Sequence, residues 1–261
     1  MQFGTSTWIF QEYSICEALE HIVECGFHVA EIWMEHLWKT GESPEEIARH
    51  ARHLQMELSL HSASYDVNIT SLNPGIRKES LRQLEESIIT GRRLGAKRIA
   101  VHPGYLSSRK VHVHTYWTQM EETFTLINQW AQREGLIVGV EAMENLPRHE
   151  YTVPDHLRRV LAKGWTNIGV TFDIAHAFSH MDPVDFLHQL DPQWIVHVHL
   201  SDSSPKATHL PLGKGEVDLQ AILRELDNVY NGFVIIEGAV PSQGKEITHS
   251  NKAYLQQLGW Q

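Results

Sequence analysis

Short apolar runs rich in β-forming residues alternate with longer segments of helical periodicity along the whole 261-residue sequence. This alternation is typical of repeated strand–helix units, in which each helix returns the chain so that the next strand lies parallel to the last. The strand-like runs comprise residues 2–8, 29–33, 56–62, 98–102, 137–141, 168–173, 195–200 and 233–237. A chain close to the roughly 250 residues of an eightfold repeat predicts an α/β fold, a single (β/α)8 barrel forming one domain over residues 1–261.

Apolar stripes and start signals support helices between these runs. Spacings of three and four residues, as one buried helix face requires, occur in two stripes: Met120, Phe124, Ile127 and Ala131, and Leu81, Leu84 and Ile88. Ser43-Pro44 offers an N-cap hydroxyl followed by a proline at the first helical position, and Glu46 could close a capping box. Asp182-Pro183 predicts another helix start of the same kind.

Six side chains of metal-binding types stand at the carboxyl ends of strands three to eight. They are His61, His102, Glu141, Asp173, His199 and Glu237. In a parallel barrel the carboxyl ends of the strands meet at one rim, which is where active sites lie. Mixed histidine and carboxylate ligands suit zinc, manganese, magnesium or cobalt. The sequence therefore predicts a metalloenzyme with its active site at the C-terminal ends of the strands.

Charge and composition narrow the choice of partners. The formal net charge of −10 opposes binding to a phosphate backbone, which argues against a nucleic-acid partner. No charged leader opens the sequence and no run of about 18 apolar residues could span a membrane.

The two cysteines, Cys16 and Cys25, fall nine residues apart in one predicted helix and cannot pair there. We expect a soluble cytoplasmic protein; its oligomeric state, including a homo-oligomer, stays open.

Three motifs carry a resemblance to a known family: FDIAHA, with Asp173 and His176 as D-x-x-H, HVHLSDS, and HLPLGKGEVD. Over nearly its whole length the chain resembles the xylose isomerase-like barrel superfamily, which contains sugar isomerases and epimerases, inosose dehydratases and the endonuclease IV repair nucleases. In the isomerases and epimerases one divalent ion is held by Glu, Asp, His and Glu from four strand ends. The resemblance implies that the metal ligands here are Glu141, Asp173, His199 and Glu237.

The resemblance also implies that Glu141 and Glu237 are catalytic and reach opposite faces of the carbon that loses its proton. A metal that chelates adjacent carbonyl and hydroxyl oxygens acidifies the C–H between them and stabilises an ene-diolate, while two carboxylates remove and return the proton. Glu141 is preferred over Glu144 because Glu141 ends the apolar run and Glu144 falls in the following loop. The leading hypothesis is a metal-dependent isomerase or epimerase of a small sugar or sugar phosphate. A dehydratase is a close variant, since the same ene-diolate can expel a β-hydroxyl.

His61 and His102 define the alternative. Endonuclease IV uses histidines at comparable positions to bind a further zinc, so the resemblance allows a second ion beside Glu141. One ion is expected and two would favour a two-metal phosphoesterase or abasic-site nuclease. Alternatively both rings contact substrate or form hydrogen bonds inside the barrel mouth. Ala207 stands where the third zinc of endonuclease IV needs an aspartate, which argues against three-metal cleavage.

Five further residues are expected to contact the substrate. His176 and His209 would bind hydroxyls or a phosphate. Trp8, Trp33 and Tyr65, near strand ends, would stack on the apolar face of a sugar ring and exclude water, although core packing would explain these aromatic residues equally well.

Overall fold

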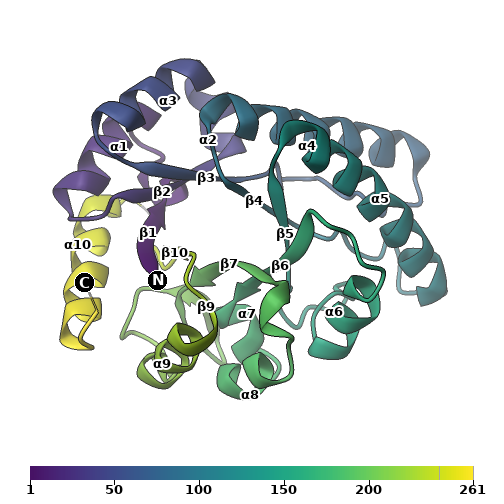
Figure 1. Ribbon diagram of the computed structural model, residues 1–261. Helices are drawn as coiled ribbons and strands as arrows, with labels where there is room; N and C mark the ends of the chain where they lie inside the picture. Colours follow the sequence, from purple (N-terminus) through teal and green to yellow (C-terminus); the bar gives the residue numbers. More distant parts are fainter. Residues whose placement is uncertain (241, 261) are drawn as a thin grey trace.

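The computed structural model describes residues 1–240 and 242–260, and in it eight parallel strands close into a barrel (Figure 1). The strands are β1 (Gln2–Ser6), β2 (Val29–Trp33), β3 (Glu57–His61), β4 (Arg98–Val101), β5 (Ile137–Glu141), β6 (Ile168–Asp173), β7 (Ile195–Leu200) and β10 (Phe233–Ile236). Around the ring the order is β1-β10-β7-β6-β5-β4-β3-β2, and β1 closes it by pairing with β2. The predicted (β/α)8 barrel is confirmed, and every predicted strand is present.

Helices surround the strands on the outside of the ring (Figure 1). They are α1 (Ile15–Glu24), α2 (Met34–Thr40), α3 (Pro44–His53), α4 (Pro74–Leu94), α5 (Val113–Glu134), α6 (Pro154–Leu161), α7 (Ile174–Phe178), α8 (Pro183–His188), α9 (Leu219–Val229) and α10 (Gly244–Gln257). Two short 3-10 helices, η1 (Thr7–Phe10) and η2 (Pro192–Trp194), and a hairpin of β8 (Asp202–Ser204) and β9 (Ala207–Leu210) complete the fold.

The predicted helix stripes face the barrel. All four apolar residues of the α5 stripe are fully buried in the main hydrophobic cluster, as are Leu84 and Ile88 of α4. Leu81, one turn earlier on α4, packs against the same cluster while staying partly exposed. Each of these helices packs its apolar side against the strands, as the spacing of the apolar residues requires. This packing holds the helices in place around the barrel.

The first strand is shorter than predicted. It ends at Ser6, whose side-chain oxygen accepts a hydrogen bond from the Trp8 backbone N–H at 3.2 Å and so caps η1. Serine at this position favours a turn because its hydroxyl satisfies a backbone donor that a strand would otherwise pair. Trp8 therefore lies in a 3-10 helix at the barrel rim and not in a strand.

Helix starts are only partly as predicted. Asp182 caps α8 by accepting from the backbone N–H groups of residues 184 and 185, as expected. The capping box predicted for α3 is wrong: Ser43 is the N-cap, but its hydroxyl donates to the carboxylate of Glu45 at 3.0 Å and caps no backbone N–H. A charged acceptor two residues away competes with the helix for this hydroxyl. A complete capping box forms instead at α1, between Ser14 and Glu17.

The β8–β9 hairpin was not predicted, although its second strand ends within the HLPL segment, at Leu210. It follows β7 directly, and Asp202 anchors it by accepting backbone N–H groups of Ser203, Gly215 and Val217 at 2.8–3.1 Å. A Cβ at Gly215 would lie 2.3 Å from the Asp202 carboxylate, so only glycine fits there. This anchoring carries His209, on β9, over the end of the barrel where the strands finish.

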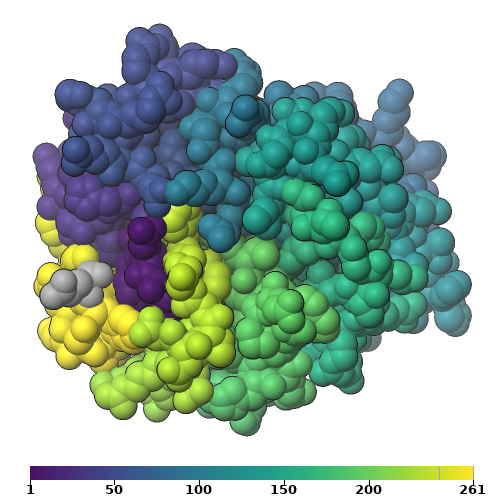
Figure 2. Space-filling model, viewed as in Figure 1, coloured from purple at the N-terminus to yellow at the C-terminus, as the bar shows by residue number. Residues whose placement is uncertain are grey.

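The first and last strands of the barrel lie side by side in the barrel wall. Figure 2 shows the purple N-terminal residues beside yellow-green residues near the C-terminus, in agreement with the parallel pairing of β1 with β10. No helix within residues 1–240 and 242–260 is both long and apolar enough to cross a lipid bilayer. Both cysteines are free thiols, as the sequence predicted.

Glu42 supplies a cap that can be tested. Its carboxylate accepts the backbone N–H groups of Ile15 and Cys16, in the first turn of α1, at 2.5 and 3.1 Å. Partial burial would raise its pKa, but these two hydrogen bonds hold the pKa below the usual 4.5. We expect Glu42→Gln to lower the free energy of unfolding by about 1 kcal/mol at neutral pH, because an amide offers one acceptor oxygen in place of two.

A lowered folded pKa means that this contribution is present above pH 4.5 and is lost as the pH falls through the folded-state pKa. Urea unfolding should therefore show the wild-type advantage shrinking in acid. Glu46→Gln, which removes the same charge from an exposed residue nearby, is the control and should change stability little at either pH. If the difference in unfolding free energy between wild type and Glu42→Gln stays unchanged in acid, the capping role of Glu42 is contradicted.

Candidate metal centre

Four of the predicted residues converge at the carboxyl end of the barrel. Glu141 ends β5, Asp173 ends β6, His199 lies near the end of β7, and Glu237 directly follows β10. Neighbouring strands in the order β10-β7-β6-β5 bring them together, although the residues span almost a hundred positions of the sequence. All four are buried. The barrel thus brings two glutamates, one aspartate and one histidine together in a buried site.

His199 lies at the centre of this group. Its Nδ1 lies 3.3 Å from an oxygen of Glu237, 3.6 Å from one of Glu141 and 4.0 Å from one of Asp173. Asp173 uses its other oxygen to accept the His176 backbone N–H at 2.7 Å, which caps α7. The capping bond fixes the carboxylate and leaves Oδ2 directed at the group.

The donor atoms of this group fit a divalent cation. Four buried atoms, one from each residue, lack a hydrogen-bond partner among the residues described: Glu141 Oε2, Asp173 Oδ2, His199 Nδ1 and Glu237 Oε1. Buried polar atoms are normally paired, so unpartnered atoms on four neighbouring residues need an explanation. Three carboxylate oxygens and one imidazole nitrogen are a ligand set that zinc and manganese accept. These buried groups could bind a metal.

The local charges perturb the side-chain pKa values strongly. Burial raises the pKa of Glu237 to about 7, against the pull of the His199 ring. Burial would raise the pKa of Glu141 too, but the rings of His199 and His102 hold it well below its usual range. Burial would lower the pKa of His199, and the carboxylates of Glu237, Glu31 and Glu141 instead raise it well above its usual value. The site holds excess negative charge that a proton or a cation must balance.

His61 and His102 lie on the other side of Glu141, as the alternative hypothesis requires. Their Nε2 atoms lie 3.7 and 3.3 Å from Glu141 Oε2. With Glu141 they form a second group whose possible ligand atoms all lie within 4.8 Å of one another. His61 is buried and stacks on Trp33, with ring centroids 4.2 Å apart, whereas His102 is partly exposed. The arrangement therefore offers a second place for a cation.

His176 and His209 also reach the site. Their Nε2 atoms lie 3.1 Å apart, and His176 Nδ1 lies 3.1 Å from Glu141 Oε1. His209 has a positive φ of 54°, a strained conformation for a residue with a Cβ. Glu144 lies in the loop after β5 as expected, yet its side chain still reaches the cavity and lies 3.4 Å from His176 Nε2. A residue of this loop therefore lines the cavity together with residues of the strand ends.

The group opens into a cavity of about 180 Å³. Its lining comprises Trp8, Trp33, His61, His102, Glu141, Met143, Glu144, His176, His209 and Glu237. Tyr65 is not among these residues: it is 56% exposed at the rim, where its hydroxyl accepts the indole N–H of Trp8 at 3.0 Å. The two tryptophans therefore form a cavity wall, and Tyr65 extends this aromatic surface outward.

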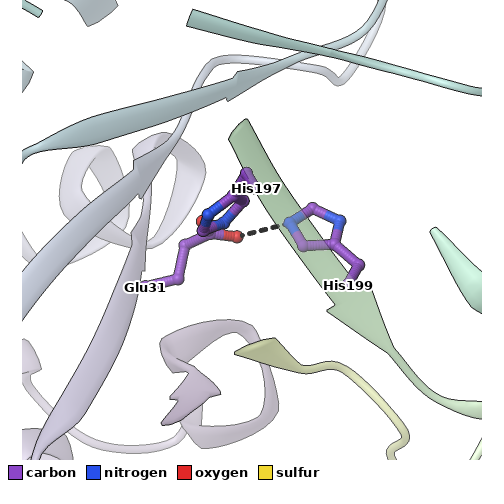
Figure 3. Close-up of side chains that lie close together, drawn as sticks. All are labelled: Glu31, His197 and His199. Atoms are coloured by element: carbon purple, nitrogen blue, oxygen red, sulfur yellow. Dashed lines mark hydrogen bonds and ion pairs between the residues drawn. The ribbon is translucent and has the colours of Figure 1, made fainter. Parts of the chain in front are cut away.

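Sequence reasoning missed two buried residues beneath the site, Glu31 on β2 and His197 on β7. Glu31 accepts hydrogen bonds from His197 and from His199 (Figure 3). One signal was available, since an acid stands inside the apolar run VAEIW and His197 precedes His199 by two residues, on the same face of the strand. Which side chain meets this acid depends on β2 and β7 facing each other across the barrel.

Comparison with known proteins places the chain in a family. A family model described as a xylose isomerase-like TIM barrel matches residues 19–261. The chain belongs to this family, as its motifs suggested. An uncharacterized protein of Methanocaldococcus jannaschii is 27% identical over 244 residues, covering 91% of this chain and 83% of the relative.

Solved structures share the whole fold. A D-tagatose 3-epimerase-like protein has a TM-score of 0.87 at 25% identity, covering 99% of this chain and 98% of that one. The apo 3-keto-D-glucoside 4-epimerase from E. coli has a TM-score of 0.85 at 21% identity, covering 98% and 99%. The IOLI protein with a bound zinc atom has a TM-score of 0.81 at 16% identity, covering 99% and 96%.

The raised pKa of Glu237 predicts how stability depends on pH. With its folded pKa at about 7 and its usual value at 4.5, Glu237 contributes stability below pH 4.5 and loses it as the pH rises through 7. In chelator-treated protein, wild type should therefore lose unfolding free energy relative to Glu237→Gln between these two pH values. Urea unfolding of both proteins measures the difference, and a difference that stays flat over this range would contradict the burial of an ionisable Glu237.

Proposed function

We propose that this protein is a divalent-metal-dependent isomerase or epimerase of a small sugar or sugar phosphate. The observation that carries the proposal is the convergence of Glu141, Asp173, His199 and Glu237 with one unpartnered buried atom each. One divalent ion held by these four residues would supply the missing partners and balance their negative charge. Of the metals considered, zinc receives support from a protein of the same fold that binds it.

When bound, the ion would polarise a substrate carbonyl and make the neighbouring C–H more acidic. The two glutamates are the proton-transferring groups of the proposal. Glu141 comes from β5 and Glu237 from the end of β10, with β6 and β7 between them, so they approach the cavity from different sides. One carboxylate can take a proton from one face of the carbon while the other returns a proton to the opposite face.

The remaining cavity residues suit a polyhydroxylated ring. Trp8 and Trp33 offer apolar faces with ring centroids 5.9 Å apart, on which the C–H face of a sugar can stack. His176, His209 and Glu144 present donors and acceptors for hydroxyls. Proteins of the same fold that are described as sugar epimerases support this substrate class, although at identities of 25% and below.

Exchange of a carbon-bound proton tests the proposal. Incubated in deuterated water with a panel of aldoses and ketoses, the metal-loaded protein should introduce deuterium into at least one sugar, as followed by proton NMR. Glu141→Gln and Glu237→Gln should each slow this exchange on the order of 10²- to 10⁴-fold, because an amide cannot accept the proton.

Glu57→Gln is the matched control. Glu57 begins β3, at the opposite end of the barrel, so its loss should leave exchange unchanged. The proposal is contradicted if the wild-type protein shows neither proton exchange nor isomerisation with any sugar of the panel. A loss in Glu57→Gln equal to that in Glu141→Gln would show that the assay reports on folding rather than on proton transfer.

The second group, His61, His102 and Glu141, favours one competing function. Two ions bridged by Glu141 could activate water and stabilise a leaving oxygen, as in a phosphoesterase or abasic-site nuclease. The net charge of −10 opposes a nucleic-acid substrate.

Counting bound metal separates the two functions. We expect one tightly bound ion per chain, loss of sugar proton exchange on treatment with a chelator, and recovery on adding manganese or zinc. Elemental analysis of the purified protein measures the ratio, with Asp173→Asn as the control that should lower it. Two ions per chain together with chelator-sensitive incision of an abasic duplex would replace the isomerase proposal with the hydrolytic one.

A further inference from the structure

A carboxylate without access to solvent lies directly beneath the candidate metal centre. Glu31 Oε2 lies 2.7 Å from His197 Nε2 and accepts the Ser59 hydroxyl at 2.9 Å, and Glu31 Oε1 lies 3.1 Å from His199 Nε2. All four side chains are fully buried. In Figure 3 the two rings of β7 point at the Glu31 carboxylate from β2. Glu31 thus contacts His199 on the side opposite the cavity.

The charge of Glu31 determines which ring atoms carry protons. Its two oxygens accept the Ser59 hydroxyl and lie within hydrogen-bond distance of a nitrogen of each ring, which are the surroundings of an ionised carboxylate. An ionised carboxylate only accepts hydrogen bonds, so both rings must donate their Nε2–H to it. In neutral His199 the unprotonated nitrogen is then Nδ1, the atom that faces Glu237, Glu141 and Asp173.

The cluster is a set of hydrogen bonds and not a metal site of its own, despite its metal-binding residue types. A divalent ion would sit between the carboxylate and the rings, at roughly 2.0–2.2 Å from each ligand atom. Here the carboxylate meets each ring directly, at 2.7 and 3.1 Å, and Ser59 occupies a further acceptor position. These hydrogen bonds satisfy the Glu31 carboxylate without an ion.

We propose that Glu31 is a positioning residue that fixes the orientation and tautomer of His199 for cation binding through Nδ1. This inference rests on the proposed function, because it assumes that His199 is a metal ligand. Glu31 is not among the residues that line the cavity, so its proposed role is exerted through His199. Its acceptor also makes the ring a better ligand, since a histidine that donates its other N–H to a carboxylate is more basic.

Metal affinity tests this role independently of activity. Glu31→Gln keeps the size of the side chain but removes its charge and replaces one acceptor by a donor. We expect the dissociation constant for manganese, measured by competition with a chelator, to rise about 10- to 100-fold. The variant should also show a lower Tm, because the cluster is buried.

His197→Gln is the matched control. It keeps a hydrogen-bond donor toward Glu31 but alters the contact at Oε2, whereas His199 contacts Oε1. Its Tm should fall, and its manganese affinity should stay within about threefold of wild type. An equal loss of affinity in both variants, or wild-type affinity in Glu31→Gln, would overturn the positioning role. A wild-type protein that binds no manganese would overturn this inference and the proposed function together.

The tautomer can be read without any variant, which covers the case that Glu31→Gln does not fold. In the zinc-loaded wild-type protein labelled with 15N-histidine, long-range proton–nitrogen NMR should place the His199 proton on Nε2 and the metal on Nδ1. A His199 proton on Nδ1 would overturn the inference even if the protein binds metal and exchanges sugar protons.

Discussion

Four carboxylates, those of Glu31, Glu141, Asp173 and Glu237, are buried at one end of this barrel, and the rest of the site depends on how their charge is balanced. Transferring an ionised carboxylate out of water is costly unless hydrogen bonds or a cation replace the water. Imidazole rings and backbone N–H groups provide part of this compensation. Each of the four proposed ligand residues still keeps one buried atom without a hydrogen-bond partner, and a divalent ion is the simplest completion of the site.

The site is built in layers along the barrel axis. Deepest are Glu31, His197 and Ser59, which form a hydrogen-bonded cluster around the Glu31 carboxylate. Above it stand the four proposed ligands. His199 belongs to both layers because its Nε2 meets Glu31 and its Nδ1 meets the carboxylates of the upper layer. At the rim, aromatic rings and the β8–β9 hairpin narrow the opening. A rigid lower layer supporting an incomplete upper layer is what ligand binding requires.

Much of the fold could be predicted because its signals are local. The apolar stripe of α5 and the strand-like runs reflect burial of one face or both faces of an element, which residue spacing records directly. Errors arose where a polar side chain had alternative partners close by. The hydroxyl of Ser43 binds Glu45 and not the helix, and that of Ser6 ends β1 early. The sequence shows both serine hydroxyls, but it does not show which of the available partners each hydroxyl binds in the folded protein.

By itself the sequence determined the barrel fold and placed the candidate metal ligands at the ends of its strands. Both follow from local sequence patterns, because the end of a strand can be recognised from the residues around it. Only the tertiary structure decided which of these residues meet. Closure of eight strands brought Glu31 of β2 beneath His199 of β7, and the loop after β5 turned Glu144 back into the cavity. Such contacts depend on the stagger and tilt of distant strands, which the pattern of any single segment does not record.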